Sequence, residues 1–258
     1  RGTTFPTDST SIRFEYPNIV QAITDIAVDY VDNEGNAGKF LALNGSYTPV
    51  ASVKNNGNTN VNSSISVTTR IIDPVGITSY TNTLQIDSLQ PTVDSLKSFP
   101  PFSPLVAGRY TVQTYINRVT GDAASSNDTS EFLLKVVDTT QSPVILDYSD
   151  GVSGLGIGWS GGNGGCGVYI EPPYYPARIV AANYYITTVG NPASGFHSII
   201  LDDNGRQAGQ GTILDSTFVD VVNITPGAYN RVPLATPIVV NSGGIYLYWL
   251  MDGATVNL

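Results

Sequence analysis

Cysteine and histidine are almost absent from this chain. Its 258 residues include one cysteine, Cys166, and one histidine, His197, so neither an intramolecular disulfide nor a cluster of histidine ligands for a metal can form. A thiol nucleophile needs a base close by, and Cys166 lies in the glycine-rich stretch 164–167. We therefore expect Cys166 to be a small, half-buried packing residue and His197 to lie on the outer face of a strand.

Charge and long apolar runs are scarce as well. Charged residues make up 13% of the chain, about half the usual share. The net charge of −9 disfavours nucleic acid as a partner, because an acidic surface repels phosphate backbones. No apolar run approaches the roughly 20 residues that span a bilayer, so direct membrane insertion is not expected. Runs of Glu, Lys, Leu and Ala that would build long amphipathic helices are also missing.

The residues that are present favour strands, because Thr, Val and Tyr suit a pleated, half-buried surface. The fold class that we predict is all-β, with two tandem antiparallel β-sandwich domains. A leader covers residues 1–22, an immunoglobulin-like sandwich covers 23–137, a polar linker covers 138–143, and a jelly-roll-like sandwich covers 144–258.

Alternating apolar residues and intervening turn residues predict the individual strands. In the first domain they are Ile23–Tyr30, Lys39–Leu43, Tyr47–Lys54, Ser64–Ile72, Ile77–Ile86, Arg109–Val119 and Glu131–Val137. In the second domain they are Val144–Tyr148, Gly167–Glu171, Arg178–Val189, Phe196–Asp202, Thr212–Val219, Tyr229–Leu234 and Gly244–Leu250. The three prolines of Phe99–Pro104 remove backbone donors, which predicts a crossover between sheets there.

Three short motifs give the first domain a resemblance to a known family. They are Val53-Lys54-Asn55-Asn56-Gly57-Asn58, then Gly108-Arg109-Tyr110-Thr111-Val112, then Ser126-Asn127-Asp128-Thr129. In this order they resemble the hairpin end and the two late strands of CARDB-like domains, immunoglobulin-like modules of adhesion-related proteins. The resemblance covers Ile23–Val137 and implies a non-catalytic surface module.

The second domain resembles sandwich domains of large secreted proteins of Bacteroidetes, which commonly leave the cell by type IX secretion. The residues that carry this resemblance are Tyr174-Tyr175-Pro176-Ala177-Arg178-Ile179, Ile200-Leu201-Asp202-Asp203-Asn204-Gly205 and Gly243-Gly244-Ile245-Tyr246-Leu247. Bacteroidetes glycosylate Asp-Ser/Thr triplets on exported proteins, which would make this chain a glycoprotein. The candidate O-glycosylation sites are Ser9, Ser88, Ser95, Thr139 and Ser216. Turns rich in Ser and Thr also produce such triplets without any modification.

Two motifs, one of catalytic serines and one of dinucleotide-binding sites, match the sequence but lack the structural context in which they work. Gly158–Gly162 matches G-x-S-x-G and Gly156–Gly161 matches G-x-G-x-x-G, but each motif works only where a helix follows the glycine-rich turn. Strands and prolines follow here instead, so we expect no catalytic residue and no cofactor site. A glycine-rich surface loop is the better interpretation.

Two binding sites remain open. The loop of Asp202, Asp203 and Asn204 offers hard oxygen ligands, which makes it the one candidate for a structural Ca²⁺ site, although a plain hairpin tip is the simpler alternative. Aromatic residues crowd the second domain, and exposed rings such as Trp159 and Tyr185 could stack on sugars or pack under loops.

From these observations we expect a non-enzymatic structural or adhesive module, exported to the cell surface or secreted, with its signal sequence already removed. Its partners would be other surface proteins or neighbouring domains of the same polypeptide. The alternative is a carbohydrate-binding accessory domain of a secreted enzyme, with glycans as the partner.

Overall fold

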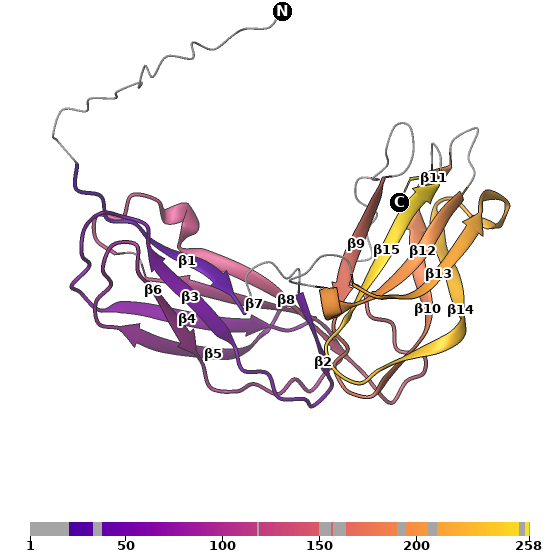
Figure 1. Ribbon diagram of the computed structural model, residues 1–258. Helices are drawn as coiled ribbons and strands as arrows, with labels where there is room; N and C mark the ends of the chain where they lie inside the picture. Colours follow the sequence, from indigo (N-terminus) through magenta and orange to yellow (C-terminus); the bar gives the residue numbers. More distant parts are fainter. Residues whose placement is uncertain are drawn as a thin grey trace, which may run out of the picture.

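Strands dominate the computed structural model of the protein, which describes residues 21–32, 38–117, 119–149, 156, 164–189, 195–205, 211–252 and 256–257. The only helices in these ranges are short 3₁₀ turns, so the all-β prediction is confirmed. Within the same ranges no helix is long and apolar enough to cross a membrane. Figure 1 shows the strands in two groups, β1–β8 and β9–β16, which lie side by side.

The first group forms two sheets that share one core. The strands are β1 (Ile26–Val31), β2 (Gly38–Ala42), β3 (Val50–Asn55), β4 (Ile65–Ile72), β5 (Thr78–Ile86), β6 (Asp94–Ser98), β7 (Gly108–Ile116) and β8 (Thr129–Val137). A three-stranded sheet has the order β1-β3-β6, and a five-stranded sheet has the order β2-β8-β7-β4-β5. Alternate residues of both sheets, including Ile26, Val53, Val67 and Val112, are fully buried in a single apolar cluster. This is the two-layer packing of a sandwich.

The motif after β3 has a structural explanation. The amide nitrogen of Asn55 donates to the carbonyl oxygens of Thr59 and Leu89, and its Oδ1 accepts from the backbone N–H of Gly57. A Cβ atom on Gly57 would lie 2.4 Å from the carbonyl oxygen of Ile23, so only glycine fits against that backbone. Asn55 and Gly57 therefore fix this hairpin end against the residues that precede β1.

The second group contains a four-stranded sheet of order β13-β12-β15-β9 and the pairs β10-β14 and β11-β16. The strands are β9 (Gly165–Ile170), β10 (Ala177–Ile186), β11 (Thr188–Val189), β12 (Gly195–Asp202), β13 (Ile213–Asp220), β14 (Ala228–Val240), β15 (Ile245–Asp252) and β16 (Val256–Asn257). Phe196, Trp249 and Met251 of the four-stranded sheet are buried against Tyr184 and Ile186 of β10. The four-stranded sheet and the β10-β14 pair therefore enclose a core of their own.

Several predicted elements differ from the structure. Val144–Tyr148 is not a strand: the residues are irregular, and Leu146 and Tyr148 pack on the second group of strands without pairing with a neighbouring strand. Strand β6 and the short β16 were not predicted, and β2 pairs with β8 in parallel rather than antiparallel. The crossover at Phe99–Pro104 is confirmed, since it joins β6 of one sheet to β7 of the other.

Candidate functional site

Strand β2 supplies one side chain to each of the two groups of strands. Leu41 packs against the core of β1–β8. Its neighbour Phe40 is only 4% exposed and belongs to a cluster with Ile200 and Ile245 of the second group. Because successive strand side chains point to opposite faces, β2 lies between two apolar environments. In Figure 1 it is the strand of the first group nearest the second.

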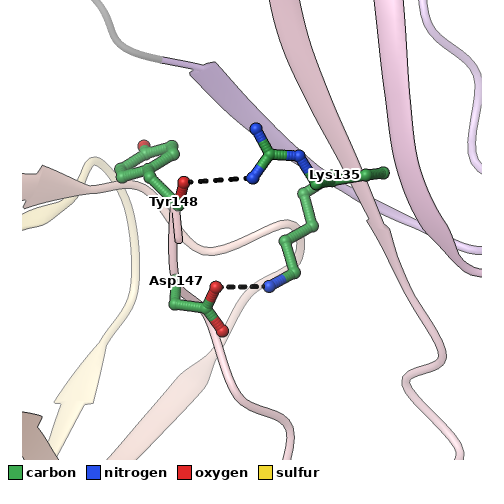
Figure 2. A network of polar contacts seen from close by, with 4 residues as sticks. Lys135, Asp147 and Tyr148 are labelled. Carbon is green, nitrogen blue, oxygen red and sulfur yellow. Dashed lines mark hydrogen bonds and ion pairs between the residues drawn. The ribbon is translucent and has the colours of Figure 1, made fainter. Parts of the chain in front are cut away.

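The irregular segment after β8 closes this junction. The ring of Tyr148 lies 4.8 Å from that of Phe40, centroid to centroid, at an interplanar angle of 34°. Figure 2 shows the polar contacts alongside: Lys135 Nζ of β8 donates to Asp147 Oδ1 at 2.6 Å, and Arg109 of β7 reaches the carbonyl oxygen of Tyr148 at 3.5 Å. The Lys135–Asp147 pair is partly exposed, so it contributes about 0.2–1 kcal/mol. The apolar contact of Phe40 carries more of the stability of the junction.

A small cleft of about 180 Å³ opens beside Phe40 and Tyr148. Residues of both groups line it, among them Asp32 and Lys39 on one side and Glu171 on the other. Lys39 Nζ lies 3.8 Å from Asp32 Oδ2.

The cleft shifts the ionisation of two of its groups. Burial raises the pKa of the Asp32 carboxyl; Lys39 lowers it in part, and Glu171 raises it further. Burial, with a smaller effect of Glu171, raises the pKa of Tyr148 to about 12. At neutral pH the phenol of Tyr148 is therefore neutral, and the fold disfavours the ionised form of Asp32.

The described residues contain no group of three or more His, Cys, Asp or Glu that could hold a metal ion. Cys166 lies half-buried in β9, and burial raises the pKa of its thiol, so it is a poor nucleophile. His197 is half-buried in β12, where its ring lies 5.1 Å from that of Phe218, centroid to centroid. No side-chain hydrogen bond joins Cys166 or His197 to another residue in the ranges that the structure covers.

The predicted calcium loop is closed by its own hydrogen bonds. Asp203 Oδ2 accepts from the hydroxyl of Tyr169 at 3.1 Å and from the backbone N–H of Gly244 at 2.8 Å. Asn204 donates to Asp202 Oδ2 at 3.2 Å and accepts from the backbone N–H of Thr212 at 2.9 Å. These contacts hold the hairpin without an ion, and a bound Ca²⁺ there stays a prediction.

The other predicted site residues are scattered. Among the glycosylation candidates, Ser88 and Ser216 are exposed, Ser95 and Thr139 are half-buried, and Ser9 lies outside the described residues. Trp159 and both glycine motifs at 156–162 also fall outside them, apart from Gly156. Tyr185 packs edge-on against Tyr229, with ring centroids 5.2 Å apart. Among the candidates that lie in the described ranges, the structure thus brings none together into one site.

Sequence reasoning missed the junction. The signal for it was the uninterrupted apolar run Phe40–Leu43, because a strand that is apolar on both faces is covered on both faces.

Comparisons with known proteins give limited likenesses. No known family and no curated protein matches the chain. Among solved structures, two of a CARDB domain from Pyrococcus furiosus, one in solution and one a crystal with di-metal ions, are each 19% identical. They cover 45% and 46% of this chain and 97% of their own, with TM-scores of 0.36 and 0.37. A domain described as part of a cell surface protein of Methanosarcina acetivorans is 21% identical over 44% of this chain and 92% of its own, with a TM-score of 0.34. At these values the likenesses do not assign the chain to a family.

Proposed function

We propose that this chain is a non-enzymatic structural or adhesive module of the cell surface, one segment of a larger exported protein or assembly. Its two parts are the CARDB-like sandwich of residues 23–137 and the jelly-roll-like sandwich of residues 144–258, joined at 138–143. The observation that carries the proposal is the junction at Phe40. Domains of one chain move freely relative to one another unless an apolar interface holds them, and here a buried side chain crosses from one core to the other.

A fixed junction suits a module that holds neighbouring parts of an assembly in one orientation or bears mechanical load along it. The surroundings of Cys166 also support a role without catalysis, since burial raises the pKa of its thiol and, among the described residues, no side-chain hydrogen bond joins it to a base. The low charge of the chain fits the same role, because few fixed charges leave few sites for non-specific ionic contacts.

Export and glycosylation belong to the same proposal. Ser88 and Ser216 are exposed, as an acceptor must be, and both follow an aspartate. The test is the intact mass of the native protein recovered from its own cells, with the same chain made in a host without this modification as control. A mass above 27.4 kDa that falls in sugar-sized steps on deglycosylation is expected from the surface fraction. An unmodified chain recovered from the cytosol would refute export.

The second candidate is the carbohydrate-binding accessory domain. Exposed tyrosines of the second group favour it, among them Tyr174 at 44% and Tyr248 at 36% exposure. Measurable affinity of the chain for a glycan, lost on replacement of an exposed ring, separates this candidate from a purely structural module.

A further inference from the structure

The outer face of the four-stranded sheet β13-β12-β15-β9 is apolar and aromatic. Trp249 and Met251 of β15 point into the core, at 1% and 0% exposure. Alternation therefore sends Tyr246, Tyr248 and Leu250 to the opposite face. Their partners in the neighbouring strands continue this face: Tyr169, Gly167 and Gly165 of β9, and Leu201, Ile199 and His197 of β12. Phe218 of β13, which is 45% exposed, stands beside His197.

The five-stranded sheet of the same chain shows what a solvated face looks like. On its outer side Arg70 Nε donates to Gln113 Oε1 at 2.6 Å, and Gln113 in turn donates to Glu131. Thr68 and Thr83 are hydrogen-bonded at 2.8 Å on the same side. A one-sided sheet normally carries polar residues of this kind on its outer face. The aromatic face of the other sheet departs from that pattern. Tyr248 and Phe218 are exposed on it, whereas Leu201 is buried, and exposed apolar groups on such a face mark interaction sites.

Two glycines let tyrosine rings lie against the sheet. Gly167 is the cross-strand partner of Tyr248, and a Cβ atom on Gly167 would lie 2.7 Å from carbons of the Tyr248 ring. A Cβ atom on Gly244 would lie 2.6 Å from the ring of Tyr169. Because both glycines lack a Cβ atom, the two rings can lie directly against the backbone. This packing fixes the positions of the rings before any ligand binds. Such preorganisation lowers the entropic cost of binding.

The three tyrosines form a continuous row. Ring centroids of Tyr169 and Tyr246 lie 5.0 Å apart, and those of Tyr246 and Tyr248 lie 6.4 Å apart. Successive rings are turned by 48° and 45°.

We propose that this row, on Tyr169, Tyr246 and Tyr248, binds a single chain of an electrically neutral glycan. Between the two ends of the sheet, the outward positions of β9, β12 and β15 carry no Asp, Glu, Lys or Arg, in a chain of net charge −9. A charged polymer would find no counter-charge over Tyr246 and Tyr248, whereas a neutral sugar needs none. The charged groups near the row lie at its Tyr169 end, where Asp203 accepts from the Tyr169 hydroxyl and Asp32, Lys39 and Glu171 line the adjoining cleft.

The tyrosines also match both kinds of surface that a sugar presents. Aromatic faces stack on the apolar faces of sugar rings, and phenol hydroxyls bond to hydroxyl groups at their edges. The hydroxyls of Tyr246 and Tyr248 make no hydrogen bond to any residue that the structure describes, so they are available to a ligand. Tyr169, at one end of the row, also lines the cleft at the junction. This binding function deepens the second candidate function, the carbohydrate-binding domain, and rests on it.

The test uses the full chain, made in a host that adds no O-glycan, so that Ser216 on the neighbouring strand is unmodified. Affinity electrophoresis in gels that contain mixed-linkage β-glucan, xylan, mannan or dextran measures binding to neutral polysaccharides. Tyr248→Ala and Tyr246→Ala are each expected to weaken binding to the retarding polysaccharide by about tenfold, the loss of one stacked ring. Tyr229→Ala is the matched control, because this exposed tyrosine lies on β14 of the other sheet, and it is expected to leave the mobility unchanged.

Two further measurements make the result specific. Gly167→Ala removes no aromatic group but displaces the Tyr248 ring, so it is expected to weaken binding while the melting temperature changes little. Light scattering after size exclusion reports whether the face joins two copies of the chain instead. The proposal is overturned if no polysaccharide retards the protein, if retardation survives Tyr248→Ala, or if a dimer forms that Tyr248→Ala dissociates.

Discussion

Replacing Phe40 by alanine separates the two cores that β2 connects. Truncation of a buried phenylalanine in a core costs about 3–5 kcal/mol. Phe40 adjoins the 180 Å³ cleft, so water can enter part of the space left behind, and we expect about 3 kcal/mol. Because the cluster of Phe40 otherwise consists of residues from the second group and the segment after β8, the loss should fall on the unfolding of that group. Its thermal transition should move down by about 10 °C.

Leu41→Ala is the matched control, since it truncates the adjacent side chain of the same strand on the face that packs against the first core. Differential scanning calorimetry and amide hydrogen exchange of both variants give the comparison. Phe40→Ala should speed exchange in β12 and β15 and leave β4 and β7 protected, whereas Leu41→Ala should do the reverse. Equal effects of the two variants on both groups, or no effect of Phe40→Ala on the second group, would refute the assignment of Phe40 to the second core.

Three further changes test separate features. Because burial in the folded protein raises the pKa of Asp32 above the ordinary value of an aspartate, the stability that its protonated form provides is lost as the pH rises through the folded pKa. Asp32→Asn should therefore melt higher than the wild type at pH values above the folded pKa of Asp32 and match it where the carboxyl is protonated in both states, and a constant difference across a titration from acid to neutral pH would contradict the assignment. Gly57→Ala forces a methyl group against the Ile23 carbonyl and should cost about 1–3 kcal/mol in urea unfolding; an unchanged midpoint would show that the hairpin end adjusts freely. If the loop of Asp202, Asp203 and Asn204 holds Ca²⁺, excess chelator should lower the melting temperature, and an unchanged value removes the site.

The fold class and most of the strands could be predicted because alternation is strong wherever one face of a strand is buried. Strand β4, for example, alternates between buried and partly exposed residues along most of its length. Strand β6 was missed because it is a short edge strand whose one large apolar residue, Leu96, is 60% exposed, so no apolar face marks it. Strand β14 was predicted to end at Leu234 but runs to Val240 through Pro233 and Pro237. Its sheet has only two strands, and an unpaired edge tolerates proline.

At Val144–Tyr148, by contrast, a strand was predicted where the structure has none. Leu146 and Tyr148 alternate because both pack on the second group of strands, and a pattern of burial alone does not reveal whether a backbone partner exists.

The candidate sites were harder to predict than the strands, because they depend on contacts between distant residues. Phe40 and Tyr148 are far apart in sequence, and no local pattern pairs them. The crowding of aromatic residues in the second half was visible in the sequence. The row of Tyr169, Tyr246 and Tyr248 was not, since it requires the register of β9 against β15. Tyr185 looked like an outward ring by the same alternation, yet Tyr229 covers one of its sides.

The most direct test of the central claim, a fixed junction between the two groups of strands, is a distance distribution between spin labels across it. Labels at Thr81→Cys in β5 and Ser216→Cys in β13, both exposed positions, would be placed in a Cys166→Ser background and measured by pulsed electron resonance. One narrow distance that broadens in the Phe40→Ala variant is the expected result. A broad distribution that Phe40→Ala leaves unchanged would contradict the rigid module.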